Sequence, residues 1–181
     1  MFNPLKSRFS RREEGSLSVE TVLILPLLAL AILMTFVLWD AFKTVNINQK
    51  ATYTIADMLS REKREITPDY MTTIHELHAY LGNRSDGNAV RVTVVTMTED
   101  PDTNVKSMEL VWSKSVGGLE DHTDINAISS RISDMAVGDQ MILVEGVQAW
   151  TPAFNIGLPP YNFRQTAVLR PRPPQLKWSD A

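Results

Sequence analysis

The chain contains a long apolar run near its N-terminus. The run extends from Leu17 to Trp39, reads LSVETVLILPLLALAILMTFVLW, and holds one charged residue, Glu20, among its 23 residues. A membrane-spanning helix needs about 20 apolar residues, whereas the core of a secretory signal has about 7 to 15 and precedes a small-residue cleavage pattern. No such pattern follows this run. We therefore expect a transmembrane helix over residues 16–39 rather than a signal peptide or a buried soluble helix.

Basic residues flank the run unequally. Four of them lie between positions 6 and 12, whereas only Lys43 and Lys50 follow the run before Arg61. Because basic residues are retained on the cytoplasmic side of a membrane helix, residues 1–15 are expected in the cytoplasm and the chain after Trp39 outside it. Trp39 then lies at the outer membrane–water interface, where an indole ring is favoured.

The residues after the run continue a helical pattern. No glycine or proline occurs between Trp39 and Pro68, and apolar side chains recur at helical spacing, among them Phe42, Ile55 and Leu59. We expect an amphipathic extension of the same helix over residues 40–65. The alternative is a break near Asn46–Asn48 followed by a second helix.

Residues 66–181 predict a small α+β domain outside the cytoplasm. Thr67 is a suitable N-cap for a helix over 68–81, with Pro68 at its first position and Gly82 at its end. Runs rich in β-branched or alternating apolar residues predict an antiparallel sheet with strands at 89–97, 105–115, 141–151 and 163–170. A third helix is expected over 125–136, capped by Asp124.

The tail contains Arg170, Arg172 and Lys177 among prolines. We interpret it as a solvated chain end, the alternative being contact with lipid headgroups or a protein partner.

Composition argues against several classes of function. The chain has no cysteine, which excludes thiol nucleophiles, disulfides and cysteine zinc sites. Its net charge is −3, so the body of the chain offers no basic surface for nucleic acid. Phosphate-binding glycine loops and nucleophile-elbow motifs do not occur. We therefore expect a protein that is not an enzyme, with no catalytic residue, cofactor, small-molecule substrate or nucleic-acid partner.

Three histidines are candidates for a metal site. His75 and His78 stand three residues apart on the expected helix, and His122 lies close to two aspartates. This spacing supplies half of a zinc site at most, and a tethered metalloenzyme would require all three to converge. The sequence favours solvated helix residues instead, so no metal ligand is predicted.

Two residues are unusual for a plain membrane anchor. Glu20 places a carboxylate in the apolar run, at a cost of about 2.5 to 3.5 kcal/mol near the bilayer centre. Pro26 removes a helix hydrogen bond and is expected to kink the helix. Glu20 alone is explained by a side chain that reaches back to the membrane interface.

Together with Gly15, these residues resemble a known junction. The stretch Glu14-Gly15-Ser16-Leu17-Ser18-Val19-Glu20, after a short basic leader, is similar to a type IV prepilin cleavage site, with glutamate at the fifth position after the glycine. Val19-Glu20 followed by Pro26 resembles more specifically the TadE/TadG-like pseudopilins of tight-adherence (Flp-type) pili. Near the C-terminus, Trp150-Thr151-Pro152-Ala153-Phe154 and Thr166-Ala167-Val168-Leu169-Arg170 are similar to the closing strands of that family.

The resemblance implies a TadE-like minor pilin or pseudopilin with a pilin-like fold. Prepilin peptidase would cut after Gly15, leaving Ser16 as the new N-terminus in the bacterial inner membrane, with the C-terminal domain in the periplasm. Implied partners are the lipid bilayer, prepilin peptidase, other pseudopilins and the inner-membrane platform of pilus assembly. The alternative is an uncleaved single-pass anchor whose periplasmic domain scaffolds an envelope complex.

The chemistry of the junction agrees with this resemblance. Cleavage would give Ser16 a free α-amine, and Glu20 follows four residues later, one helical turn away. An ammonium and a carboxylate that are close together in a low dielectric each offset the desolvation of the other. The amine can also belong to a neighbouring subunit, a pairing that would set the axial register of assembly in pilins.

Overall fold

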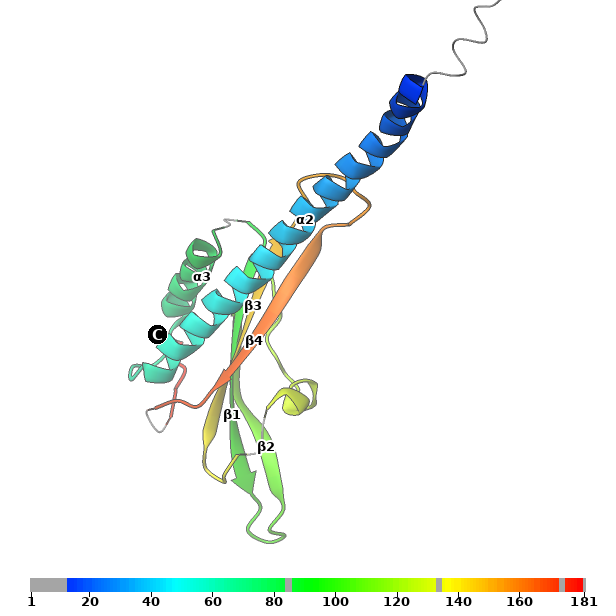
Figure 1. Cartoon of the computed structure of the whole chain (residues 1–181). Coiled ribbons are helices and arrows are strands. Elements are labelled where there is room, and N and C mark those ends of the chain that lie inside the picture. Colours follow the sequence, from blue (N-terminus) through cyan, green and yellow to red (C-terminus); the bar gives the residue numbers. More distant parts are fainter. Residues whose placement is uncertain (1–12, 84–85, 133–134, 173–174, 181) are drawn as a thin grey trace, which may run out of the picture. The chain divides into compact units, whose positions relative to one another are not determined.

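A computed structural model describes residues 13–83, 86–132, 135–172 and 175–180, with the backbone alone for 13–18 and 127. The chain is α+β, with a long N-terminal helix followed by a small antiparallel sheet and a shorter helix (Figure 1). It divides into two compact units. One contains Met1–Ala41 with Pro152–Pro159, and the other contains Phe42–Thr151 with Pro160–Ala181.

Helix α2 extends from Glu13 to Arg61 and includes Pro26 without ending there. It passes through Asn46–Asn48 unbroken, so the alternative of two helices is wrong. Among the residues that the structure describes, one helix is long and apolar enough to cross a membrane, and α2 is that helix. Its side chains are exposed from Val19 to Phe36.

The end of α2 has a local cause. It lies at Arg61, four residues before the predicted end, because the Glu62 carboxylate accepts hydrogen bonds from the backbone of Lys63 (3.0 Å) and Arg64 (3.1 Å). Such local side-chain bonds offer the backbone an alternative to helix.

Helix α3 extends from Pro68 to Gly82 and confirms the second predicted helix. The Thr67 hydroxyl oxygen accepts from the Tyr70 backbone N–H at 3.3 Å, and Pro68 occupies the first turn. At the other end Asn83 adopts the left-handed conformation, with φ of 51°. Short polar residues tolerate this conformation, so Asn83 takes the capping position that was expected of Gly82.

The described residues form one antiparallel sheet in the order β2-β1-β3-β4 (Figure 1). Its strands are β1 (Asn88–Glu99), β2 (Lys106–Val116), β3 (Gln140–Trp150) and β4 (Tyr161–Leu169). All four predicted strands are present, with ends shifted by one or two residues. β1 and β3 are central and read as nearly continuous apolar runs because both of their faces are covered.

The third predicted helix is wrong. In place of a helix over 125–136 the chain makes two short 3₁₀ turns, Ile125–Ala127 and Ser129–Arg131. Asp124 caps the first turn as expected, but Ile132 is already extended. The isoleucines reach the sheet without a helix, in a buried cluster with β-strand residues that comprises Val95, Met97, Ile128, Ile132, Met135 and Leu143.

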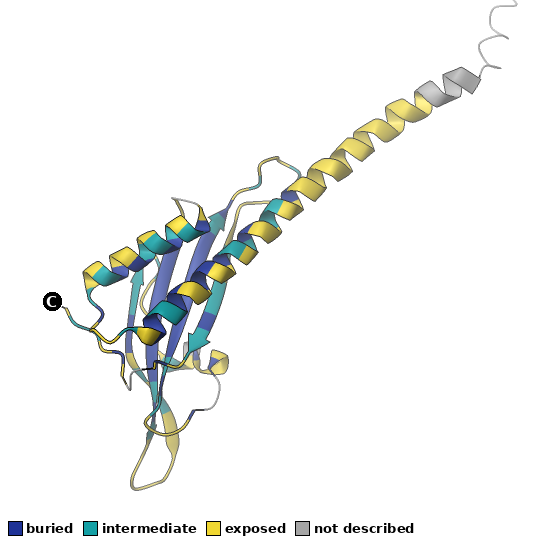
Figure 2. Ribbon diagram, turned by 60° about the vertical axis from the view of Figure 1, so that its left-hand side comes forward, coloured by how far each residue is buried: buried dark blue, intermediate teal, exposed yellow. Residues whose placement is uncertain are grey.

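Each face of the sheet has its own cover. The face that bears Val92 and Val144, here called the helix face, packs against α3 and against residues 42–61 of α2 (Figure 2). The opposite face, which bears Val95 and Leu143, is here called the loop face, because the segment between β2 and β3 covers it.

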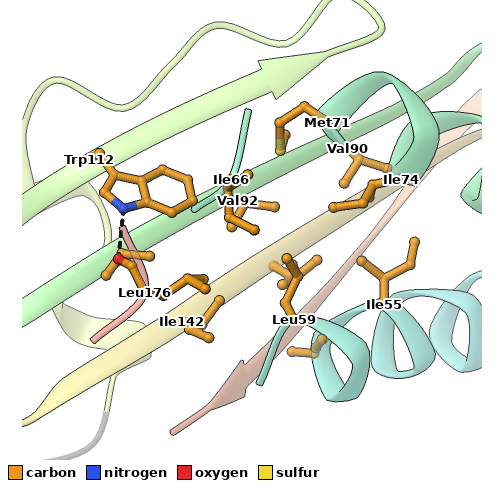
Figure 3. Close-up of a cluster of buried hydrophobic side chains, with 14 residues drawn as sticks. Ile55, Leu59, Ile66, Met71, Ile74, Val90, Val92, Trp112, Ile142 and Leu176 are labelled. Atoms are coloured by element: carbon orange, nitrogen blue, oxygen red, sulfur yellow. Dashed lines mark hydrogen bonds between the residues drawn. The ribbon is translucent and has the colours of Figure 1, made fainter. Parts of the chain in front are cut away.

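The main core lies on the helix face and depends on α2. Ile55 and Leu59 of α2 are fully buried there beside Ile74 of α3 and Ile142 of β3 (Figure 3). Residues 42–61 therefore belong to the same compact unit as the sheet. The sequence-based boundary at residue 66 separates these helix residues from the core that they help to form.

The C-terminal tail is not a solvated end. Leu176 is 1% exposed, and its carbonyl accepts a hydrogen bond from the Trp112 indole at 3.2 Å (Figure 3). Trp178 forms a parallel bridge with Ile66, and its ring lies 5.7 Å from that of Trp112. The tail therefore completes the core beside the end of α2.

Candidate functional site

The predicted processing site lies at the beginning of α2. Gly15 and Ser16 have helical backbone, and the leader up to residue 12 lies outside the described residues. Glu20 is exposed on the same helix and lines a shallow groove with Thr21, Ile24, Leu25 and Leu28. Glu20 is therefore an exposed carboxylate on an apolar helix face, one turn after Ser16. Cleavage after Gly15, the pairing of Glu20 and the kink at Pro26 stay predictions.

The three histidines do not come together. His75 Nε2 lies 2.9 Å from the backbone carbonyl of Asn88, and His78 lies on the helix face against Asn48. His122 lies on the loop face, with Nε2 3.0 Å from a Glu145 carboxylate oxygen. No group of three His, Asp or Glu side chains able to hold a metal ion occurs among the described residues. The expectation that the helix histidines are solvated is wrong for His78, which is fully buried.

A buried polar layer joins α2, α3 and the sheet. The Asn48 side-chain amide donates to the carbonyls of Gly146 (3.2 Å) and Phe163 (2.9 Å). These two bonds fix the amide orientation, so Asn48 Oδ1 is the atom that faces His78 Nε2 at 2.9 Å. His78 therefore donates from Nε2, and this bond selects its neutral tautomer.

Burial makes this histidine hard to protonate. Desolvation, helped by the nearby His75, lowers the pKa of His78 to about 4. Its Nδ1 has no hydrogen-bond partner among the described residues. His78 is thus a neutral core residue at physiological pH, which suits a structural role better than proton transfer near neutrality.

Gly146 allows the layer to close. A Cβ at this position would lie 2.2 Å from the Thr52 hydroxyl and 2.7 Å from His78 Nε2. Both distances are far below van der Waals contact, so the helices reach the sheet here only because residue 146 has no side chain.

A second polar cluster lies on the loop face around Glu145, which is fully buried. Its Oε2 accepts from the Arg91 guanidinium, with Nε at 2.7 Å, and from His122 Nε2 at 3.0 Å. Its Oε1 accepts from Arg131 at 2.8 Å, and an Arg164 nitrogen lies 3.8 Å away. Burial alone raises the pKa of Glu145, but the hydrogen bonds and charge of Arg91 and then of His122 hold it below its ordinary value.

The Glu145 cluster holds the segment between β2 and β3 against the sheet through hydrogen bonds. Arg91 also donates to the Glu120 carbonyl at 2.7 Å, and the His122 backbone N–H donates to the Ser113 hydroxyl at 3.0 Å. A carboxylate that is fully enclosed by cationic donors is a poor base, so its chemistry here is structural.

The sequence did contain a signal for this cluster. Arg91 and Glu145 each interrupt a run of β-branched or apolar residues in a central strand. Opposite charges inside two such strands indicate a cross-strand pair, and the β1–β3 register makes Arg91 and Glu145 direct partners.

Comparison with known proteins adds no relative. No protein-family model matches the chain, and no curated protein or solved structure matches it. The TadE-like resemblance therefore rests on the residues of the junction and of the closing strands.

Proposed function

We propose that the chain is a TadE-like minor pilin or pseudopilin of a tight-adherence pilus assembly system. In this proposal α2 inserts in the bacterial inner membrane with its N-terminus in the cytoplasm, and the sheet domain lies in the periplasm. Prepilin peptidase removes the leader after Gly15. The mature subunit then acts in pilus biogenesis with other pseudopilins and the inner-membrane platform.

The observation that carries the proposal is the continuity of α2. One helix includes the Gly15 junction, the exposed apolar segment and the buried residues Ile55 and Leu59 of the domain core. A pilin-like subunit needs this arrangement, because the same helix must be processed at one end and must hold the domain at the other. A scaffold that is merely anchored can use any linker after its span.

Glu20 supports the same proposal through its chemistry. A carboxylate on the apolar face of a membrane helix is costly unless a cation meets it. Cleavage after Gly15 supplies that cation as the Ser16 amine, on the same chain or on a neighbour. In an uncleaved anchor the Ser16 amine is not free, and the Glu20 carboxylate can be stabilised only by reaching the membrane–water interface.

The most buried ionisable groups of the domain have structural contacts. His78 and the Glu145 cluster, the most buried of them, hold α2, α3 and the β2–β3 segment on the sheet. The proposal therefore assigns the domain to recognition and assembly.

Mass spectrometry of the mature N-terminus tests processing. In the native host the protein should begin at Ser16, and deletion of prepilin peptidase should leave it beginning at Met1. Gly15→Ala should also leave the leader attached, because the peptidase requires close approach to the backbone, whereas Ser18→Ala is the matched control that should be cleaved. A protein that begins at Met1 when the peptidase is present would favour the uncleaved anchor instead.

Assembly is tested at Glu20. Glu20→Ala and Glu20→Gln should insert and be cleaved, yet should lose piliation or co-purification with assembly partners, since both remove the charge that meets the amine. Thr21→Ala, the neighbouring control, should assemble normally. Normal piliation in both Glu20 variants would remove any role of Glu20 in assembly.

A further inference from the structure

The longest stretch without charge outside the apolar run lies between Glu145 and Arg164. Its 18 residues, Gly146 to Phe163, contain no Asp, Glu, Lys, Arg or His. Residues 151–160, with the sequence TPAFNIGLPP, form the connection between β3 and β4. The prolines, asparagine and glycine of this loop suit a turn, whereas its apolar residues Phe154, Ile156 and Leu158 call for an explanation.

The loop presents apolar side chains outward. Phe154 is 49% exposed, and Tyr161, which opens β4, is 61% exposed. The Tyr161 ring lies 5.2 Å from that of Phe163, which lies 5.9 Å from Trp150. The end of the sheet from which the β3–β4 loop extends therefore carries a cluster of aromatic side chains.

The loop belongs with the membrane helix. Pro152–Pro159 and the chain up to Ala41 form one compact unit, and both ribbon views show the loop running beside α2 (Figures 1 and 2). The helix in that unit exposes Phe36 (63%) and Trp39 (72%), aromatic residues at the end of the apolar run. Tryptophan and tyrosine rings favour the boundary between hydrocarbon and headgroups, and phenylalanine is common on the apolar side of segments that lie in that boundary.

We infer that the β3–β4 loop is a second membrane contact, seated in the outer headgroup region beside α2. This inference rests on the membrane insertion of α2 that is part of the proposed function. The depth follows from the backbone. An irregular loop carries unpaired peptide groups and does not occur exposed to hydrocarbon, so the loop lies in the interface with Phe154 directed toward the lipid.

The lack of cysteine in the chain gives a direct test. Ala153→Cys, which keeps Phe154, is labelled with an environment-sensitive nitrobenzoxadiazole group in the full chain. The protein is reconstituted in vesicles of phosphatidylethanolamine and phosphatidylglycerol that carry nitroxide lipids. Thr103→Cys is the matched exposed control, in the β1–β2 turn at the opposite end of the sheet from Trp150. Met34→Cys, in the apolar run, reports insertion of α2.

The label at residue 153 should show blue-shifted emission and quenching by a shallow nitroxide, whereas the label at residue 103 should show neither. Adding Phe154→Asp should return the label at 153 to the emission of the label at 103, because the new charge withdraws the loop. Equal emission at 153 and 103, with residue 34 quenched, would overturn the inference and leave insertion intact. No quenching at residue 34 would overturn both. If the label on Ala153→Cys shows blue-shifted emission in native membranes but not in lipid vesicles, a protein rather than lipid covers the loop, and the inference is overturned.

Discussion

Acidification provides a quantitative test of the buried polar layer. His78 is fully buried, donates to Asn48, and has a pKa lowered to about 4 by desolvation. In the unfolded chain the same imidazole titrates near its ordinary value of 6.5. The unfolded state therefore binds a proton at a higher pH than the folded state, and stability falls as pH decreases through the interval between the two values.

The size of the effect follows from that interval. A depression of roughly 2.5 pKa units corresponds to about 3 kcal/mol when the whole interval has been crossed. Relative to neutral pH, the loss should reach about 1.2 kcal/mol near pH 5.5 and about 2.4 kcal/mol near pH 4.5. Glu145 contributes in a lower range, because its folded pKa lies below the ordinary value of 4.5.

The measurement is urea unfolding of the full chain in detergent, followed by fluorescence of the buried Trp112 and Trp150 across this pH range. His78→Gln retains a donor toward Asn48 but does not titrate, so its acid-induced loss should be smaller than that of the wild type by the amounts above. His75→Gln, one turn earlier on α3, removes only the smaller of the two causes of the lowered His78 pKa, so it should reduce the acid-induced loss far less than His78→Gln does. If His78→Gln loses as much stability in acid as the wild type, the buried imidazole is not the titrating group and the reasoning fails.

Three further predictions concern folding. Gly146→Ala should lower the free energy of unfolding by about 1–3 kcal/mol, because its Cβ meets a hydroxyl at 2.2 Å, and Thr52→Ala in the same background should recover part of the loss. Glu145→Gln should cost about 3–5 kcal/mol by leaving the buried Arg91 guanidinium without a charged partner. The exposed Glu109→Gln should change stability by about 0.5 kcal/mol or less in urea unfolding. A fragment that begins at residue 66 should show no cooperative thermal transition by circular dichroism, whereas one that begins at residue 42 should, because only the second retains the helix in the core.

Local signals in the sequence were sufficient for most elements. Thr67 and Pro68 begin a helix through their own hydroxyl and ring, and the β-branched runs of β1 and β3 favour strands wherever they are placed. The span is equally local, because length and apolarity define it.

Elements that depend on distant partners were harder to predict. A continuous α2 was expected, but Asn46–Asn48 left a break open as the alternative because asparagine has a low helix propensity. In the structure, the Asn48 amide binds carbonyls 98 and 115 residues later. The prediction of a third helix was wrong for a related reason. Its capping and spacing were correct, but Arg131 is held by Glu145 and the isoleucines are held by the sheet, which outweighs local helix preference.

The same division applies to the candidate sites. Gly15 and Glu20 lie five residues apart in one short segment, so a single sequence is enough to find their pattern. The Arg91–Glu145 pair and the His78 layer require the β1–β3 register and the placement of two helices, which sequence spacing does not specify.

The buried tail has a consequence for the order of biosynthesis. With the orientation proposed here, the domain emerges outside the cytoplasm from its helix onward, and Leu176 and Trp178 emerge only after all four strands of the sheet. Until they arrive, the Trp112 indole lacks its acceptor and the Ile66 backbone lacks its bridge. The domain therefore cannot finish folding until residue 178 has crossed the membrane. A pause in export before that point leaves the core without these contacts, and the arrival of Leu176 and Trp178 completes it.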